Sequence, residues 1–145
     1  MRQDLIISES VDINTSPERV WEVLTNPEII KEYLFGTNTV TDWKVGSNIF
    51  FRGEYQGTTY EDKGVILKNE PLKIISYSYW SGFSGLEDIP ENYSECTYKI
   101  ESKSPNVTKL TWTQKGFGSE EGYNHSKSGM EAFMGQIKGI AERTT

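Results

Sequence analysis

The chain has 145 residues, a formal net charge of −6 and one cysteine. This length suits one domain with a core of its own, so we expect a single domain over residues 1–145. The lone Cys96 excludes an internal disulfide and a multi-cysteine zinc site. The fifteen basic residues are scattered along an acidic chain, which disfavours nucleic acid and anionic membranes as partners.

The N-terminal residues show no targeting pattern. Residues 1–10 lack the apolar run of a signal peptide, and no later segment is apolar enough to span a bilayer. We therefore expect a cytoplasmic protein with no membrane partner. Aromatic residues make up 12% of the chain, with four Trp and eight Tyr. Tyrosine in such numbers suits a pocket with an apolar body and polar tips.

The first third of the chain predicts a strand followed by two short helices. Residues 4–13 alternate apolar and polar side chains, which is typical of a half-buried strand. Ser16 and Pro17 then provide an N-cap and a first helical residue. Pro27 ends that helix and starts a second one, for which Gly36 is a natural stop.

The remaining chain predicts strands and then one long helix. After a short threonine-rich piece we expect strands over 47–55, 58–68, 72–81, 93–102 and 107–115. Residues 82–91 contain two glycines, a proline and three acids, and predict a long loop. Residues 120–142 predict an amphipathic helix whose apolar side carries Met130, Phe133, Met134, Ile137 and Ala141. Consecutive strands joined by tight turns, with the helices outside them, predict an α+β fold with an antiparallel sheet.

Several motifs together resemble a known family. Residues 11–28, VDINTSPERVWEVLTNPE, are similar to the opening signature of the START-like (SRPBCC) superfamily, in the branch named for the activator of heat-shock-protein-90 ATPase homologues. The resemblance continues through Trp43-Lys44-Val45-Gly46, Gly64-Val65-Ile66, Thr108 to Thr113 and Gly129-Met130, and covers nearly the whole chain. Two positions depart from the family: Met130 stands where Trp is common, and Gln114 where many relatives have His.

The resemblance implies a helix-grip fold. In it a strongly curved antiparallel sheet wraps around the long C-terminal helix, two short helices close one end, and an internal cavity lies between sheet and helix. With that arrangement, the inward strand faces and one side of the helix would form a ligand cavity lined by Phe51, Tyr55, Ile75, Tyr77, Tyr79, Tyr98, Trp112, Gln114, Met130, Phe133, Met134 and Ile137. The alternative is a filled core whose tyrosine hydroxyls bond to the backbone. We favour a cavity, because these side chains supply more polar tips than a dry core readily satisfies.

No catalytic residue, metal site or cofactor is predicted. His125 is the only histidine, so a metal site has no second imidazole, and Cys96 has no predicted activating base. Glu87, Asp88 and Glu91 fall in the predicted loop, where we expect them to be solvated. The loop itself is expected to form a lid or rim at the cavity mouth.

The leading hypothesis is non-enzymatic binding of a hydrophobic or aromatic small molecule in the internal cavity. One alternative, which the branch name implies, is a chaperone partner whose heat-shock-protein-90-type ATPase the domain would regulate. Another is a cyclase- or hydratase-like enzyme that uses polar cavity residues, although no acid–base pair emerges from the sequence. We expect a monomer or weak homodimer.

Overall fold

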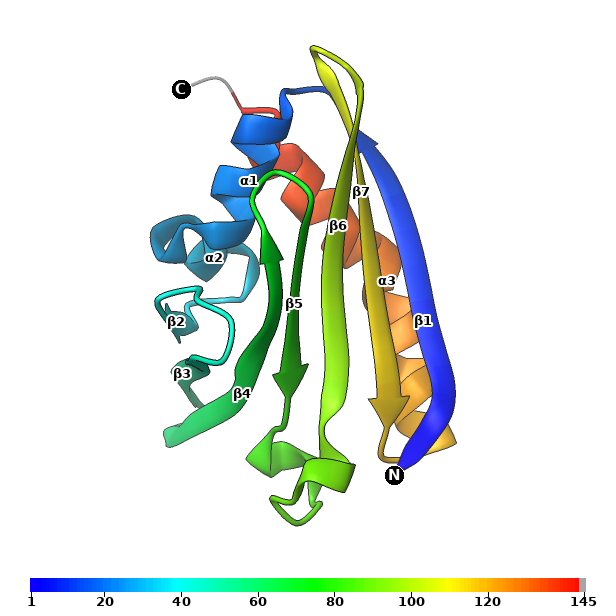
Figure 1. Ribbon diagram of the computed structural model, residues 1–145. Helices are drawn as coiled ribbons and strands as arrows, with labels where there is room; N and C mark the ends of the chain where they lie inside the picture. The colour runs from blue at the N-terminus through cyan, green and yellow to red at the C-terminus, as the bar shows by residue number, and fades with distance from the viewer. Residues whose placement is uncertain (144–145) are drawn as a thin grey trace.

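A seven-stranded antiparallel sheet forms the framework of the computed structural model, which describes residues 1–143 (Figure 1). The strands lie in the order β1-β7-β6-β5-β4-β3-β2. Their bounds are β1 Arg2–Ile13, β2 Asn38–Val40, β3 Asn48–Tyr55, β4 Thr58–Glu70, β5 Ile74–Tyr79, β6 Ser94–Ser104 and β7 Val107–Phe117. Every neighbouring pair is antiparallel. The predicted α+β helix-grip fold is confirmed.

The turn residues set the register of the hairpins. Gln56 and Gly57 have φ angles of 51° and 80°, and positive φ at both central residues is typical of the two-residue turns that join antiparallel strands. In the last hairpin Cys96 lies opposite Gln114, and Tyr98 lies opposite Trp112. The predicted placement of Tyr98, Trp112 and Gln114 on one side of the sheet therefore agrees with the register, because partners across a sheet point to the same side.

The strand predicted over 72–81 differs from the structure at its start. Strand β5 begins only at Ile74, because Leu72 has a φ of 66° and belongs to the turn after β4. Strand β4 continues to Glu70, two residues beyond the prediction. The register of β4 against β5 shifts between Ile66 and Lys68. An irregularity of this kind bends a strand, and β4 bends where the sheet curves.

Helices α1 (Pro17–Thr25) and α2 (Pro27–Tyr33) cap one end of the sheet. Each begins at a side chain that accepts a backbone N–H: Ser16 from Arg19, and Asn26 from Glu28. The Tyr33 hydroxyl donates to the carbonyl of Val23 at 2.9 Å, which holds the two helices together. Two 3₁₀ turns, η1 (Gly82–Ser84) and η2 (Pro90–Asn92), occupy the loop before β6.

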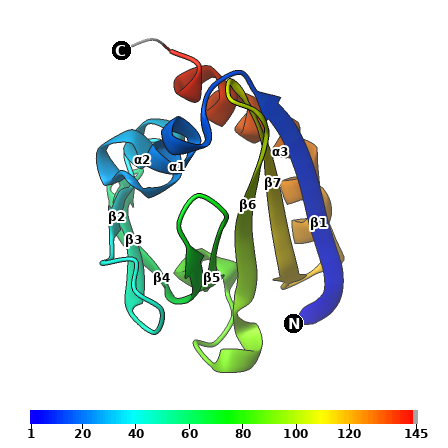
Figure 2. The same cartoon turned by 45° about the horizontal axis from the view of Figure 1, so that its top comes forward.

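Helix α3 (Glu120–Ala141) runs along β1 and β7, and its C-terminal end reaches α1 (Figures 1 and 2). The Arg19 guanidinium donates to the carbonyls of Ile140 and Ala141 at 3.1 and 3.3 Å. A cation at this position satisfies exposed carbonyls and stabilises the helix dipole. Within residues 1–143, no helix has both the length and the apolar character needed to cross a membrane.

Candidate functional site

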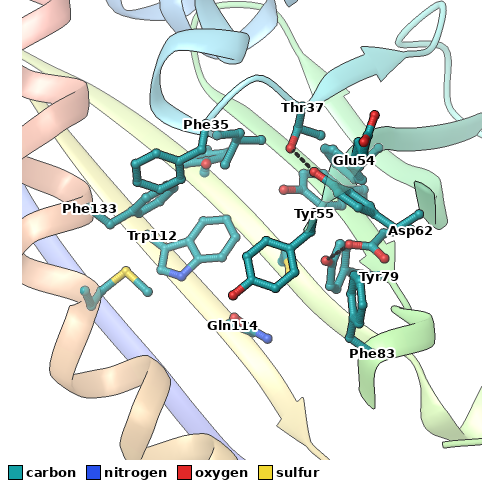
Figure 3. Close-up of a pocket in the computed structure, with 17 residues that line it drawn as sticks. Phe35, Thr37, Glu54, Tyr55, Asp62, Tyr79, Phe83, Trp112, Gln114 and Phe133 are labelled. Atoms are coloured by element: carbon teal, nitrogen blue, oxygen red, sulfur yellow. Dashed lines mark hydrogen bonds between the residues drawn. The ribbon is translucent and has the colours of Figure 1, made fainter. Parts of the chain in front are cut away.

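A cavity of about 690 Å³ lies between the sheet and the middle of α3 (Figure 3). A volume of this size is typical of small-molecule sites. Ten of the seventeen residues that line it are aromatic. The lining consists of Phe35, Phe51, Tyr55, Tyr60, Tyr77, Tyr79, Phe83, Tyr98, Trp112, Phe133, Leu34, Thr37, Glu54, Asp62, Cys96, Met130 and Gln114.

The sheet register brings the cavity residues of neighbouring strands into rows. Tyr77 of β5 lies opposite Cys96 of β6, which lies opposite Gln114 of β7. The pair Tyr98 and Trp112 forms the next row, with ring centroids 4.7 Å apart. From the other side, Phe133 of α3 meets Trp112 edge-on at 6.1 Å. The helix and sheet are therefore joined through aromatic contacts at the cavity wall.

The structure brings together nine of the twelve residues that the sequence predicts for this cavity: Phe51, Tyr55, Tyr77, Tyr79, Tyr98, Trp112, Gln114, Met130 and Phe133. Ile75, Met134 and Ile137 lie outside its lining. All three are 2% exposed or less, and they pack in the solid part of the core. Ile75 is close to Leu24 and Ile30 of the short helices. Contact of the nine residues with a ligand stays a prediction.

Several lining residues were not predicted, and Asp62 is the most informative of them. It lies on β4 two residues before Gly64 and four before Ile66, and all three are buried. Strand alternation places such residues on one face, so the parity of β4 indicates an inward carboxylate. Thr37, Glu54 and Tyr60 add further polar groups. The Thr37 and Tyr60 hydroxyls bond to each other at 2.5 Å.

The buried polar groups form a network around Asp62. The Tyr79 hydroxyl donates to Asp62 Oδ2 at 2.5 Å, while Asp62 Oδ1 has no hydrogen-bond partner among the described residues. Burial, and then the charge of Asp62, raise the pKa of Tyr79, so this hydroxyl remains a donor. Burial also raises the pKa of Tyr77 and Tyr98 well above the usual value for tyrosine. Tyr77, Tyr79 and Tyr98 therefore line the cavity as neutral groups.

Three exposed aromatic side chains surround the cavity mouth: Phe35, Tyr55 and Phe83 are 85%, 60% and 63% exposed. Phe83 belongs to η1 in the predicted loop, and its ring lies 6.3 Å from Tyr55 and 5.7 Å from Tyr60. The loop therefore contributes to the rim, while its movement as a lid stays a prediction.

The carboxylates of the loop are solvent-facing, as expected. Asp88 pairs with Lys63 at 2.5 Å and accepts from the Tyr93 hydroxyl at 2.5 Å. Lys63 is the main cause of the lowered pKa of Asp88. His125 is exposed on α3, and within residues 1–143 no group of three His, Cys, Asp or Glu side chains is placed to hold a metal ion.

Cys96 provides a probe of access to the cavity. Its thiol lines the cavity, is 3% exposed, and has its pKa raised by burial. Because the thiolate is the reactive form, we expect iodoacetamide to alkylate the native protein far more slowly than the urea-unfolded chain. Mass spectrometry over time measures both rates. Equal rates would show that the thiol is reached freely from solvent in the folded state.

A curved antiparallel sheet that grips a long helix and leaves an aromatic-lined cavity places this chain in the START-like (SRPBCC) class. The family model described as "Activator of Hsp90 ATPase homolog 1-like protein" matches residues 14–142. The chain belongs to this family.

Solved structures agree with that assignment. A Cytophaga hutchinsonii protein solved in solution is 40% identical, with a TM-score of 0.83, over 98% of this chain and 97% of its own. An HSP90 activator from Plasmodium falciparum is 17% identical, with a TM-score of 0.74, over 94% and 95% of the two chains. The Aha1 dimer from Colwellia psychrerythraea is 18% identical, with a TM-score of 0.72, over 94% and 96%. The last two show the shared fold alone. The search of curated proteins gives no match.

Proposed function

We propose that this domain binds a hydrophobic or aromatic small molecule in its internal cavity and does so without catalysing a reaction. The observation that carries the proposal is the 690 Å³ cavity whose lining is mostly aromatic. Apolar walls with a few polar groups are the usual composition of small-molecule sites. Met130 and Phe133 complete the wall from the helix side, and a flexible methionine adapts to guests of different shape.

Fluorescence titration with the neutral probe N-phenyl-1-naphthylamine tests this function. We expect saturable binding to the wild-type protein, and binding about tenfold weaker to Tyr77→Ala, a loss of about 1.4 kcal/mol. The Tyr77 ring lines the cavity, and its centroid lies 5.6 Å from that of the Phe51 ring, so its removal takes away a wall against which the probe would pack.

Tyr123→Ala is the matched control for this experiment. Tyr123 lies on α3, contacts Phe117 at 5.3 Å between ring centroids, and does not line the cavity. Its truncation removes the same number of atoms and is expected to leave probe affinity unchanged. Absence of saturable binding to the wild-type protein, or equal weakening by both variants, would contradict binding in the cavity.

Regulation of a chaperone ATPase is the second candidate, favoured by the family description over residues 14–142. The Plasmodium falciparum relative is described as an HSP90 activator. If this chain shares that role, it should raise the ATPase turnover of a bacterial chaperone of the same type. Our proposal expects no change in turnover, so the ATPase measurement separates the two functions.

A further inference from the structure

The charges around the cavity are strongly asymmetric. Within residues 1–143, two carboxylates line it, Glu54 and Asp62, and no lysine, arginine or histidine does. Basic side chains do occur on the same strands but are engaged elsewhere. Arg52 pairs with Glu61 at 2.6 Å, and Lys63 pairs with Asp88 while lying over the Trp80 ring. The negative charge of the cavity wall therefore has no basic partner within the wall.

Asp62 is the buried part of that charge. Its side chain is on the cavity wall and the residue is only 7% exposed. Among residues 1–143, however, Oδ1 has no hydrogen-bond partner and Oδ2 accepts a single bond, from the Tyr79 hydroxyl. An ionised carboxylate accepts several hydrogen bonds, and a buried one that is left incomplete is unfavourable. A donor brought by a ligand would complete its set of bonds.

The aromatic lining of the cavity also favours a positively charged ligand. Ring faces carry negative electrostatic potential, and several rings around one space stabilise an ammonium group through cation–π contacts. An anionic ligand would meet two carboxylates, with no basic side chain among the described lining residues to offset its charge. The wall thus favours cations and disfavours anions.

Building on the ligand-binding function proposed above, we propose that the cavity selects ligands that carry a protonated amine on an apolar or aromatic body, with Asp62 as the acceptor of the ammonium N–H. The rings of Tyr77, Tyr98 and Trp112 hold the apolar body. Glu54, at the more exposed side of the wall, adds a long-range attraction for the cation.

Three probes that share a naphthalene ring and differ in charge test this selectivity at neutral pH. They are the cation of 1-naphthylmethylamine, the neutral alcohol 1-naphthylmethanol and the anion of 1-naphthaleneacetic acid. In calorimetric titrations of the full chain we expect the amine to bind at least about tenfold tighter than the alcohol, and the acetate at least about tenfold weaker. If the alcohol or acetate binds as well as the amine, the inference is wrong while the binding function stands. If none of the three binds, and N-phenyl-1-naphthylamine does not bind either, the binding function itself fails.

Variants of Asp62 and of its hydrogen-bond donor Tyr79 test whether Asp62 causes the preference for the amine. Asp62→Asn keeps the shape of the side chain and an acceptor for Tyr79, and it is expected to weaken amine binding about tenfold and alcohol binding less than about twofold. Tyr79→Phe frees the second oxygen and is expected to retain or increase the preference for the amine. Loss of the preference in Tyr79→Phe, or its survival in Asp62→Asn, would overturn the role of Asp62.

Glu101→Gln is the matched control, because it removes one carboxylate from an exposed position on β6 that does not line the cavity. It should leave all three affinities unchanged. A loss of the amine preference in this variant would mean that overall charge, and not the cavity, selects the ligand. Circular dichroism of each variant checks that the fold is kept.

Discussion

Replacing Gly64 with alanine is expected to lower the free energy of unfolding by about 3 kcal/mol or more, or to prevent folding. A Cβ at this position would lie 1.6 Å from the carbonyl oxygen of Ser78 and 2.5 Å from its carbonyl carbon. Both are backbone atoms, so no side-chain rotation relieves the overlap. The two strands would have to separate.

The backbone around Gly64 shows why separation is costly. Lys63 and Trp80 exchange two backbone hydrogen bonds at 3.0 and 2.8 Å, and the Val65 amide donates to the Ser78 hydroxyl at 3.0 Å. These contacts hold β4 against the end of β5, beside the tyrosines of the cavity wall. Moving β4 outward would break these hydrogen bonds as well as packing.

Gly129→Ala provides the matched control for Gly64→Ala. Gly129 lies inside α3, and a Cβ there meets no atom within 4 Å. Alanine is the better helix former, so this variant is expected to gain up to about 0.8–1.0 kcal/mol. Urea denaturation followed by circular dichroism measures the free energy of unfolding of both variants. A Gly64→Ala protein as stable as the wild type would mean that the close approach of the strands at this point is relaxed in solution.

Local sequence patterns were sufficient to predict most of the strands and helices, while the curved grip of the sheet around the long helix was expected from the family resemblance. Strand alternation fixed which side chains face inward, and the observed pairs Cys96 with Gln114 and Tyr98 with Trp112 agree with it. The long helix was expected over 120–142 and runs over Glu120–Ala141, because Ser119 caps its start and the apolar stripe continues to its end. The late start of β5 was not predicted, since the positive φ at Leu72 has no sequence signal comparable to glycine.

The candidate site was predicted less completely than the fold. Alternation identifies the face of a strand but not the position along it, so Ile75 has the same parity as Tyr77 and still lies in the solid core. The polar residues predicted to face inward were four tyrosines and Gln114. The carboxylate of Asp62 was not among them, even though its parity matches that of Ile66. The rim residue Phe83 depends on how the 82–91 loop folds back, which short-range patterns do not encode.

The apolar stripe of α3 is expected to divide into two parts with different energetic roles. Ile137→Ala should lower the free energy of unfolding by about 2–5 kcal/mol, the usual cost of truncating a fully buried isoleucine that leaves a closed void. Ile137 has no exposed surface and does not line the cavity. Met130 lies two turns earlier and does line it, so Met130→Ala enlarges an existing space. Without a new closed void, the cost should stay near the transfer term alone, about 1–2 kcal/mol.

The same two variants should affect ligand binding in the opposite order, with Met130→Ala having the larger effect. Met130→Ala changes the cavity wall and is expected to alter the affinity for N-phenyl-1-naphthylamine several-fold, whereas Ile137→Ala should leave it unchanged wherever the protein remains folded. Urea denaturation and probe titration of the same two variants measure both effects. Equal losses of stability with equal probe affinities would mean that the stripe is one continuous core, and that the helix contributes packing but no binding surface.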